Sequence, residues 1–363
     1  MSGKRSVFIL IPLLLVFTGC GREPSPKEPA QIPPDAPPAA AQSSKAFAPV
    51  VMMESEESKQ QDAIKEKARE TFQNGDFDRL EQMAAEYRSD KDRYPEGRSK
   101  LTFFYGGLTE LDETNSDEFW TARLKALDQW VKVHPDSVTA PVALADTWIN
   151  YAWKARGHGY ADSVDSQSFQ LFEQRTALAH AILNEAGKKE AKCPGYWWVM
   201  QNVALDEGWS KSEYEKLFDM AIQSNPNFFE YYAKKSNYLL PRWYGVPGDW
   251  EEYVESAADK IGGEEGDVLY ARLVWRMIQQ RAYSRIYKET KISWARTKKG
   301  FDLLHKRYPA SLPVASEYCL EAGMMEEKET MKALFDELAG RVDLSIWLDK
   351  GRFEAFRDWA FDK

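Results

Sequence analysis

The side chains that most often bind metals or act as catalytic bases are few and widely spaced in this chain. Its four histidines form neither a His-x-x-x-His pair nor a cluster with cysteines, the arrangements that bring metal ligands together. We also find no phosphate-binding loop, nucleophile elbow or lysine–serine dyad. The sequence therefore predicts no metal site and no cofactor, and it indicates no catalytic residue. The histidines are His134, His158, His180 and His305.

Cysteine chemistry is limited to three positions. Cys193 and Cys319 are the only cysteines that follow Cys20. In an oxidising compartment these two could form a disulfide, and otherwise they would be buried free thiols. Both lie far apart in helix-rich segments, so we favour the free thiols.

Aromatic and acidic residues leave carbohydrate chemistry open. A carboxylate pair of the kind that cleaves glycosidic bonds could be hidden among the 57 acidic residues. Tyr196, Trp197 and Trp198, together with Trp243 and Trp250, could line a sugar groove. We favour core packing for these aromatic residues, because Trp and Tyr contribute heavily to helical cores.

The first twenty residues have the order of regions found in a secretory signal peptide. Lys4 and Arg5 precede an apolar run from Val7 to Phe17, which is too short to cross a bilayer as a helix. The segment Phe17-Thr18-Gly19-Cys20 resembles the lipobox of bacterial lipoproteins, although that family usually has Leu where Phe17 stands. The resemblance implies that residues 1–19 are removed and that Cys20 is acylated. An ordinary signal peptide with a chance cysteine is the alternative.

Acylation would place the protein in the bacterial cell envelope, because several acyl chains on one cysteine give firm membrane anchoring. Gly21 follows the cysteine, where Asp would favour the inner membrane in bacteria with two membranes. The lipoprotein resemblance therefore implies the outer membrane, facing the periplasm, if the host has one. Residues 20–53 are rich in proline, which predicts a disordered or extended linker.

Residues 54–363 have the spacing of amphipathic helices. One stripe consists of Trp120, Leu124, Leu127 and Val131, and similar stripes recur to the C-terminus. The segment from Ala68 to Pro95 resembles a tetratricopeptide-type helix pair with a lengthened second helix. We therefore predict an all-α fold, an irregular α-solenoid or tetratricopeptide-like superhelix, in which each helix pair buries its stripe against its neighbours.

Residues 239–250, LLPRWYGVPGDW, read as a corner between two helices. Pro241 ends the first helix, Pro247-Gly248 suits a type II turn, and Asp249 is the expected N-cap of the next helix, in a capping box with Glu252. Trp243, Tyr244 and Trp250 would fill the wedge between the helices, and Arg242 would pair with Asp249 or with carbonyls of the first helix. The alternative is an interaction surface, since aromatic residues and Arg are frequent in protein interfaces.

Two other corners complete the set of candidate interaction residues. Residues 155–161 contain Arg156 and Tyr160 and end a helix, with Gly157 as a left-handed cap. Residues 262–267 read as a turn and a helix cap. The segments 151–161, 241–250 and 266–272 together resemble a bacterial family of unknown function with Ala-Arg-Gly-x-Gly, Pro-Arg-Trp and Gly-Asp-x-Leu-Tyr-Ala-Arg motifs. This resemblance implies a helical fold and no particular reaction.

The net charge of −9 gives the chain no electrostatic basis for binding nucleic acid. The tether and the helical repeats favour a membrane-anchored scaffold that binds an unidentified envelope protein without catalysis. A cell-wall glycan binder or carbohydrate-active protein is the first alternative. A purely structural spacer is the second.

Overall fold

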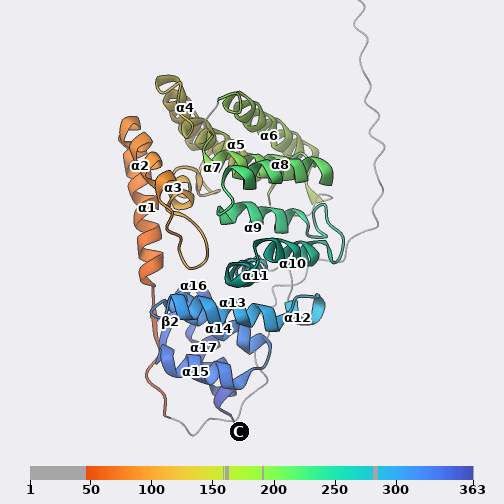
Figure 1. Cartoon of the computed structure of the whole chain (residues 1–363). Coiled ribbons are helices and arrows are strands. Elements are labelled where there is room, and N and C mark those ends of the chain that lie inside the picture. Colours follow the sequence, from red (N-terminus) through yellow and green to blue (C-terminus); the bar gives the residue numbers. More distant parts are fainter. Residues whose placement is uncertain (1–45, 158, 160–162, 190–191, 281–284, 363) are drawn as a thin grey trace, which may run out of the picture. The chain divides into compact units, whose positions relative to one another are not determined.

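The computed structural model describes residues 46–157, 159, 163–189, 192–280 and 285–362 (Figure 1). Cys20, the expected signal peptide, most of the expected linker and Tyr160 lie outside the described residues. The predicted all-α fold is confirmed: the described residues form helices together with two three-residue strands. In this part of the chain no helix is both long enough and apolar enough to cross a membrane.

The elements of the first half are β1 (Val51–Met53), α1 (Glu56–Gln73), α2 (Phe77–Ser89), α3 (Lys100–Thr109), α4 (Asp117–Val133), α5 (Ala140–Arg156), α6 (Ser166–Ala186), α7 (Pro194–Asp206) and α8 (Lys211–Ser224). Those of the second half are α9 (Phe229–Tyr238), α10 (Asp249–Ile261), α11 (Gly263–Gln279), α12 (Ile286–Glu289), α13 (Trp294–Arg307), α14 (Leu312–Met324), α15 (Lys328–Leu338), β2 (Arg341–Asp343), α16 (Leu344–Trp347) and α17 (Lys350–Phe361).

Local sequence explains several helix boundaries. Ser116 and Ser210 cap α4 and α8 through their side chains, and Ser210 forms a capping box with Glu213. Between α1 and α2, Gly75 adopts φ 71° and Asp76 caps α2. A β-carbon favours negative φ, so Gly suits this three-residue turn.

Alternate helices lie side by side in one row. The helix α3 packs against α5, α5 against α7, α7 against α9, and α9 against α11. The helices α4, α6, α8 and α10 each pack against members of this row (Figure 1). The helix α5 is central, because most of its residues are buried and it contacts α3, α4, α6 and α7.

The hydrophobic interior consists of two clusters that meet at α11. Leu273 and Val274 of α11 belong to the larger cluster, which includes residues of α1–α10. Ala271 and Trp275 belong to the second cluster, with α13–α17 and β2. The helix α13 crosses α11 closely, since a β-carbon added to Gly300 would lie 2.2 Å from the Asp267 carbonyl oxygen. The helix α11 therefore joins the two clusters.

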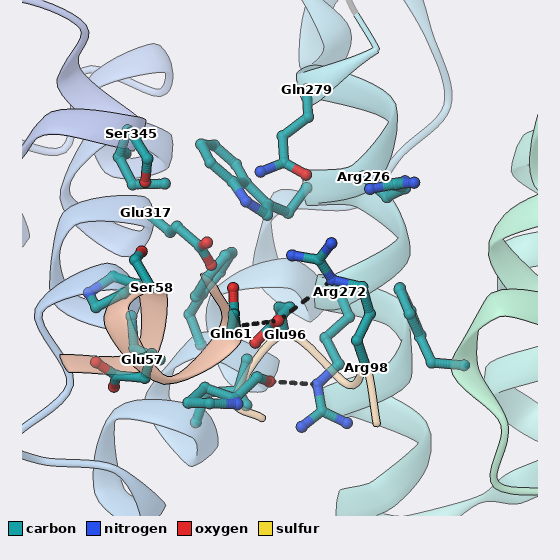
Figure 2. A pocket seen from close by; sticks show the side chains of 18 residues that line it. Glu57, Ser58, Gln61, Glu96, Arg98, Arg272, Arg276, Gln279, Glu317 and Ser345 are labelled. Carbon is teal, nitrogen blue, oxygen red and sulfur yellow. Dashed lines mark hydrogen bonds and ion pairs between the residues drawn. The ribbon is translucent and has the colours of Figure 1, made fainter. Parts of the chain in front are cut away.

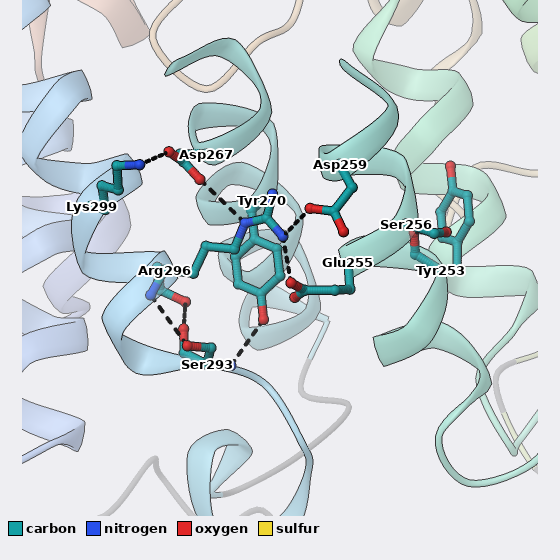
Figure 3. Close-up of polar contacts among 10 residues, drawn as sticks. Tyr253, Glu255, Ser256, Asp259, Asp267, Tyr270, Ser293, Arg296 and Lys299 are labelled. Carbon is teal, nitrogen blue, oxygen red and sulfur yellow. Dashed lines mark hydrogen bonds and ion pairs between the residues drawn. The ribbon is translucent and has the colours of Figure 1, made fainter. Parts of the chain in front are cut away.

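Polar contacts also fasten α10, α11 and α13 together. Arg296 of α13 forms ion pairs with Glu255 at 2.5 Å, Asp259 at 2.7 Å and Asp267 at 3.2 Å (Figure 3). Lys299 also binds Asp267, at 2.6 Å. The Arg296 side chain is 17% exposed, so these bonds are partly shielded from water.

The two strands were not expected from the sequence. Val51–Met53 pairs in parallel with Arg341–Asp343, and Phe47 packs edge-on against Phe361 with ring centroids 5.1 Å apart. Assigning residues up to 53 to a disordered linker was therefore wrong for residues 51–53. Their sequence carries no alternating pattern, and the strand depends on a partner from the far end of the chain.

Candidate functional site

A cavity of about 90 Å³ lies where α1 and the loop between α2 and α3 meet the C-terminal helices (Figure 2). We call it the arginine cavity, after Arg98 of the loop and Arg272 and Arg276 of α11. Gln61 of α1, Glu96 of the loop and Glu317 of α14 also line it. It has room for a few water molecules or a small charged group.

Glu96 is held at the cavity by two neighbours. Gln61 donates a hydrogen bond from Nε2 to Glu96 Oε1 at 2.9 Å, and Arg98 Nε lies 3.2 Å from the same oxygen. Burial raises the pKa of Glu96, and the charge of Arg98 opposes that shift.

Two arginines from consecutive turns of α11 face the cavity. Arg272 donates from Nε to the Pro95 carbonyl oxygen at 2.6 Å, which ties α11 to the loop. Arg276 has a buried Nε with no hydrogen-bond partner. A guanidinium group presents donors in a planar fork that suits carboxylate and phosphate groups. Arg276 therefore offers an unused donor to a bound anion.

Glu317 is the most deeply buried acid at the cavity. It is 7% exposed, and burial raises its pKa well above the usual range, with further contributions from nearby Glu96 and Glu321. Three guanidinium groups line the cavity beside the carboxyl groups of Glu57, Glu96 and Glu317. The arginine cavity therefore concentrates arginine side chains within an acidic protein.

A second ionisable cluster lies on the row α5, α7 and α9. Asp146 accepts a hydrogen bond from Thr109 Oγ1 at 2.6 Å, and Asp206 accepts one from Trp153 Nε1 at 3.3 Å. Burial raises the pKa of Asp206 to about 8. Burial also lowers the pKa of Lys234, whose charge interacts with both carboxyl groups. The cluster can therefore gain or lose protons near neutral pH.

The two clusters are electrostatically connected. The charge of Arg276 contributes to the lowered pKa of Lys234, so α9 and α11 link the arginine cavity to the acids of α5 and α7. One oxygen of Asp206, Oδ1, is buried without a hydrogen-bond partner. Buried acidic and basic side chains therefore lie along the row of helices α5, α7, α9 and α11.

The predicted corner is present, with one correction. Gly248 adopts φ 100° and ψ −23°, and Asp249 N donates to Val246 O at 3.1 Å, which confirms a type II turn around Pro247-Gly248. Asp249 is not the N-cap: Gly248 occupies that position and α10 has no side-chain cap. The Asp249 carboxylate instead accepts from Val246 N at 2.9 Å and pairs with Lys211. Closing the turn engages the side chain that was expected to cap the helix.

The aromatic residues of this corner pack inward as the structural interpretation expected. Trp250 is completely buried, Trp243 packs edge-on against Trp153 at 5.9 Å between centroids, and Tyr244 stacks on Tyr238 at 5.1 Å. A sugar groove lined by Trp250 is therefore excluded. Arg242 is exposed and lies 3.4 Å from Asn237 Oδ1 and 3.5 Å from Gln280 Oε1.

The corner after α5 has a similar structural role. Arg156 donates to the carbonyl oxygens of Gly157 and Gly159, both at 3.1 Å, and its guanidinium lies 5.0 Å from the Trp153 ring centroid. Gly157 has the expected positive φ of 70°, but its ψ of −178° is extended, so the expected left-handed cap is not formed. The turn at residues 262–267 is also shorter than expected, because α11 already begins at Gly263.

The two described cysteines are free. Cys193 and Cys319 are both buried, and they belong to different hydrophobic clusters. The disulfide alternative is therefore wrong, and the free thiols are confirmed. Tyr105 Oη lies 3.1 Å from Cys193 Sγ.

Sequence reasoning missed most residues of the two charged clusters. Arg272 fell within a noted motif, but Glu96, Arg276, Glu317, Asp206 and Lys234 did not attract attention. The one usable signal was an acid inside an apolar helix, such as Asp146 in α5. A buried acid of this kind normally has a partner, which indicates a polar site in the fold.

Comparison with protein-family models, curated proteins and solved structures found no match to this chain. Within the described residues, no group of three or more His, Cys, Asp or Glu side chains is arranged to hold a metal ion.

Proposed function

We propose that this chain is a lipid-anchored binding protein of the bacterial cell envelope, which acts as a non-catalytic scaffold for another protein. The lipid on Cys20 would hold it at the membrane, the outer one facing the periplasm if the host has two. The observation that carries the proposal is the row α3, α5, α7, α9 and α11, in which each helix packs against the next. Such a row is the basis of a tetratricopeptide-like α-solenoid, and solenoids offer extended binding surfaces.

The charges along this row favour a partner with an acidic segment. The arginine cavity contains three guanidinium groups, and Arg276 Nε has no partner within the protein. A carboxylate or phosphate group would accept hydrogen bonds from such a fork and would gain from partial desolvation. Arg242, which is exposed at the corner before α10, is a second candidate contact.

The test is co-purification from the native host. Full-length protein with a C-terminal tag is cross-linked mildly, extracted from the envelope and analysed for bound proteins. Cys20→Ala tests the anchor and Arg276→Ala tests the cavity. Arg79→Ala is the matched control, because Arg79 lies on α2, away from the cavity lining, and its side chain binds Gln82 and Glu86 of its own helix.

The proposal predicts one specific partner that the wild type and Arg79→Ala retain and Arg276→Ala loses. It also predicts that Cys20→Ala no longer fractionates with membranes. Retention of the partner by Arg276→Ala would exclude the arginine cavity from the interface. Absence of any specific partner from the wild type would favour the structural spacer instead.

A further inference from the structure

The loop between α2 and α3 contains a closed turn at the arginine cavity. Tyr94 N donates to Arg98 O at 3.0 Å, and Gly97 N donates to Tyr94 O at 2.8 Å. Pro95 suits the second position of this turn because its ring fixes φ, and Gly97 has φ 97°, which residues with a β-carbon rarely adopt. We call residues 94–98 the loop tip, and they form one wall of the cavity.

The loop tip gives two oxygen acceptors to helices that are distant in sequence. Arg272 of α11 donates from Nε to the Pro95 carbonyl oxygen at 2.6 Å. Glu96 Oε1 accepts from Gln61 Nε2 of α1 at 2.9 Å, and Arg98 Nε, within the tip, lies 3.2 Å from the same oxygen (Figure 2). A backbone carbonyl followed by the carboxylate of the next residue is therefore the pattern that α1 and α11 bind in this structure.

The backbone of the loop tip lies directly against α9 and α11. A β-carbon added to Gly97 would lie 3.0 Å from Cγ of Phe229 on α9 and 3.2 Å from Cδ of Arg272 on α11. Pro95 and Gly97 are buried, whereas residues 91–92, which lead to the tip, are exposed. The tip therefore covers a surface of α9 and α11 that another peptide segment of similar size could occupy.

These contacts select a peptide rather than a small anion. The two acceptors belong to consecutive residues, and one of them is a main-chain carbonyl, which a phosphate ion or a free carboxylic acid does not have. Asp and Glu supply the second acceptor, because their carboxylates accept from amide and guanidinium donors. The ligand that the site fits is therefore a polypeptide segment with at least one acidic residue.

We propose that the loop tip is an internal ligand of the arginine cavity, and that an acidic segment of the partner binds there by displacing it. This inference rests on the proposed scaffold function and adds how its site is regulated. The partner places a backbone carbonyl at Arg272 Nε and an acidic side chain at Gln61, and a further acid reaches Arg276 on the next turn of α11. Because the tip belongs to the same chain, it competes at an effective concentration on the order of millimolar, so weak ligands are excluded.

Fluorescence anisotropy with the full-length protein in detergent tests the proposal. The probe is a labelled peptide of residues 92–99, Asp-Arg-Tyr-Pro-Glu-Gly-Arg-Ser, and the comparison is the same peptide with Gln in place of its Glu. Glu96→Gln weakens the internal ligand and keeps its shape, so it should bind the probe about tenfold more tightly than the wild type, and the comparison peptide about tenfold more weakly than the probe. Gly97→Ala, which crowds Phe229, should also bind the probe more tightly than the wild type.

The matched control is Glu110→Gln. Glu110 pairs with Lys65 across α1 and α3 at 2.8 Å and does not line the cavity, so this variant removes the same charge and should bind the probe as the wild type does. Equal affinities of Glu96→Gln and Glu110→Gln for the probe would overturn the proposal. Absence of probe binding by the wild type, Glu96→Gln and Gly97→Ala would overturn it as well.

Hydrogen exchange in the loop distinguishes displacement from addition. With saturating probe, the protein's own Tyr94 and Gly97 amides should exchange faster, because their bonds within the tip lose the support of α9 and α11. Slower exchange would mean that the probe covers the tip, and it would overturn the proposal.

The scaffold function is judged separately, by the co-purification described above. A partner captured without any probe binding would leave the scaffold in place and overturn the role of the tip. Probe binding with the expected order of variants, but without a captured partner, would support the internal ligand and overturn the scaffold.

Discussion

Replacing Glu321 by Gln should remove a specific loss of stability that the wild type shows as the pH rises. Glu321 lies on α14 and is completely buried. The Tyr287 hydroxyl donates to its Oε2, and its Oε1 is buried without a hydrogen-bond partner. Burial raises the pKa of Glu321 to about 8, against a partly opposing hydrogen bond from Tyr287.

The sign and size of the effect follow from proton linkage. In the unfolded chain the carboxyl group ionises at its usual value of 4.5, whereas in the folded protein it keeps its proton up to about pH 8. The folded state therefore binds more protons across this window, and its stability falls as the pH rises. At about 1.4 kcal/mol per pKa unit, the fall between pH 5 and pH 8 is roughly 3–4 kcal/mol.

Urea unfolding of wild type and Glu321→Gln, followed by tryptophan fluorescence at several pH values, measures this difference. At about pH 5 the two free energies of unfolding should differ by only about 1 kcal/mol, because folded Glu321 keeps its proton and the pH lies just half a unit above its pKa in the unfolded chain. At about pH 8 the variant should be more stable by roughly 3–4 kcal/mol. The control is Glu329→Gln on α15, whose side chain is 89% exposed. Parallel pH profiles for wild type and Glu321→Gln would refute the reasoning.

Two substitutions and one thiol-reactivity assay test the packing further. Arg296→Ala should lower the free energy of unfolding by about 2–3 kcal/mol in urea titrations, because it removes a shielded hub of ion pairs. Gly107→Ala should destabilise by about 1–3 kcal/mol in the same assay, since the added β-carbon would lie 2.2 Å from the Lys65 carbonyl oxygen of α1. Cys193 and Cys319 should react with a thiol reagent only after denaturation, without prior reduction.

Each of these expectations can fail in a recognisable way. An unchanged unfolding midpoint for Arg296→Ala would mean that Lys299 alone neutralises Asp267. A gain in stability for Gly107→Ala would mean that α1 and α3 can separate at low cost. Reaction of either thiol in the native protein would contradict its burial, and a need for reductant after denaturation would contradict the free state.

The sequence was most informative where structure depends on neighbouring residues. Pro247-Gly248 predicted the turn before α10, because that turn depends on the backbone preferences of a few residues. The prediction for Asp249 failed because two kinds of backbone donor compete for its carboxylate. The carboxylate accepts from the Val246 amide of the turn and not from the amides at the start of α10.

Sites assembled from distant segments were beyond the reach of local patterns. The arginine cavity brings together Gln61, Glu96, Arg276 and Glu317, which lie on different elements and share no motif. The unpaired hydroxyl of Tyr214 was missed for another reason: its residue belongs to the buried face of an amphipathic helix, and the hydroxyl has no hydrogen-bond partner there. Periodicity predicts which face of a helix is covered, and it contains no information about a hydroxyl that finds no partner there.

The pairing of β1 with β2 has a consequence for how the protein folds. Most of the extensive contacts between elements join neighbours in the sequence. The strand pairing instead joins β1 to β2, and nearly all the described helices lie between these two strands in the chain. Closing so long a loop in an unfolded chain carries a large entropic cost. The strands meet readily only after the intervening helices have stacked and raised the effective concentration of one strand near the other. Hydrogen exchange at the Val51–Met53 amides should therefore report on whether the intervening helices are stacked.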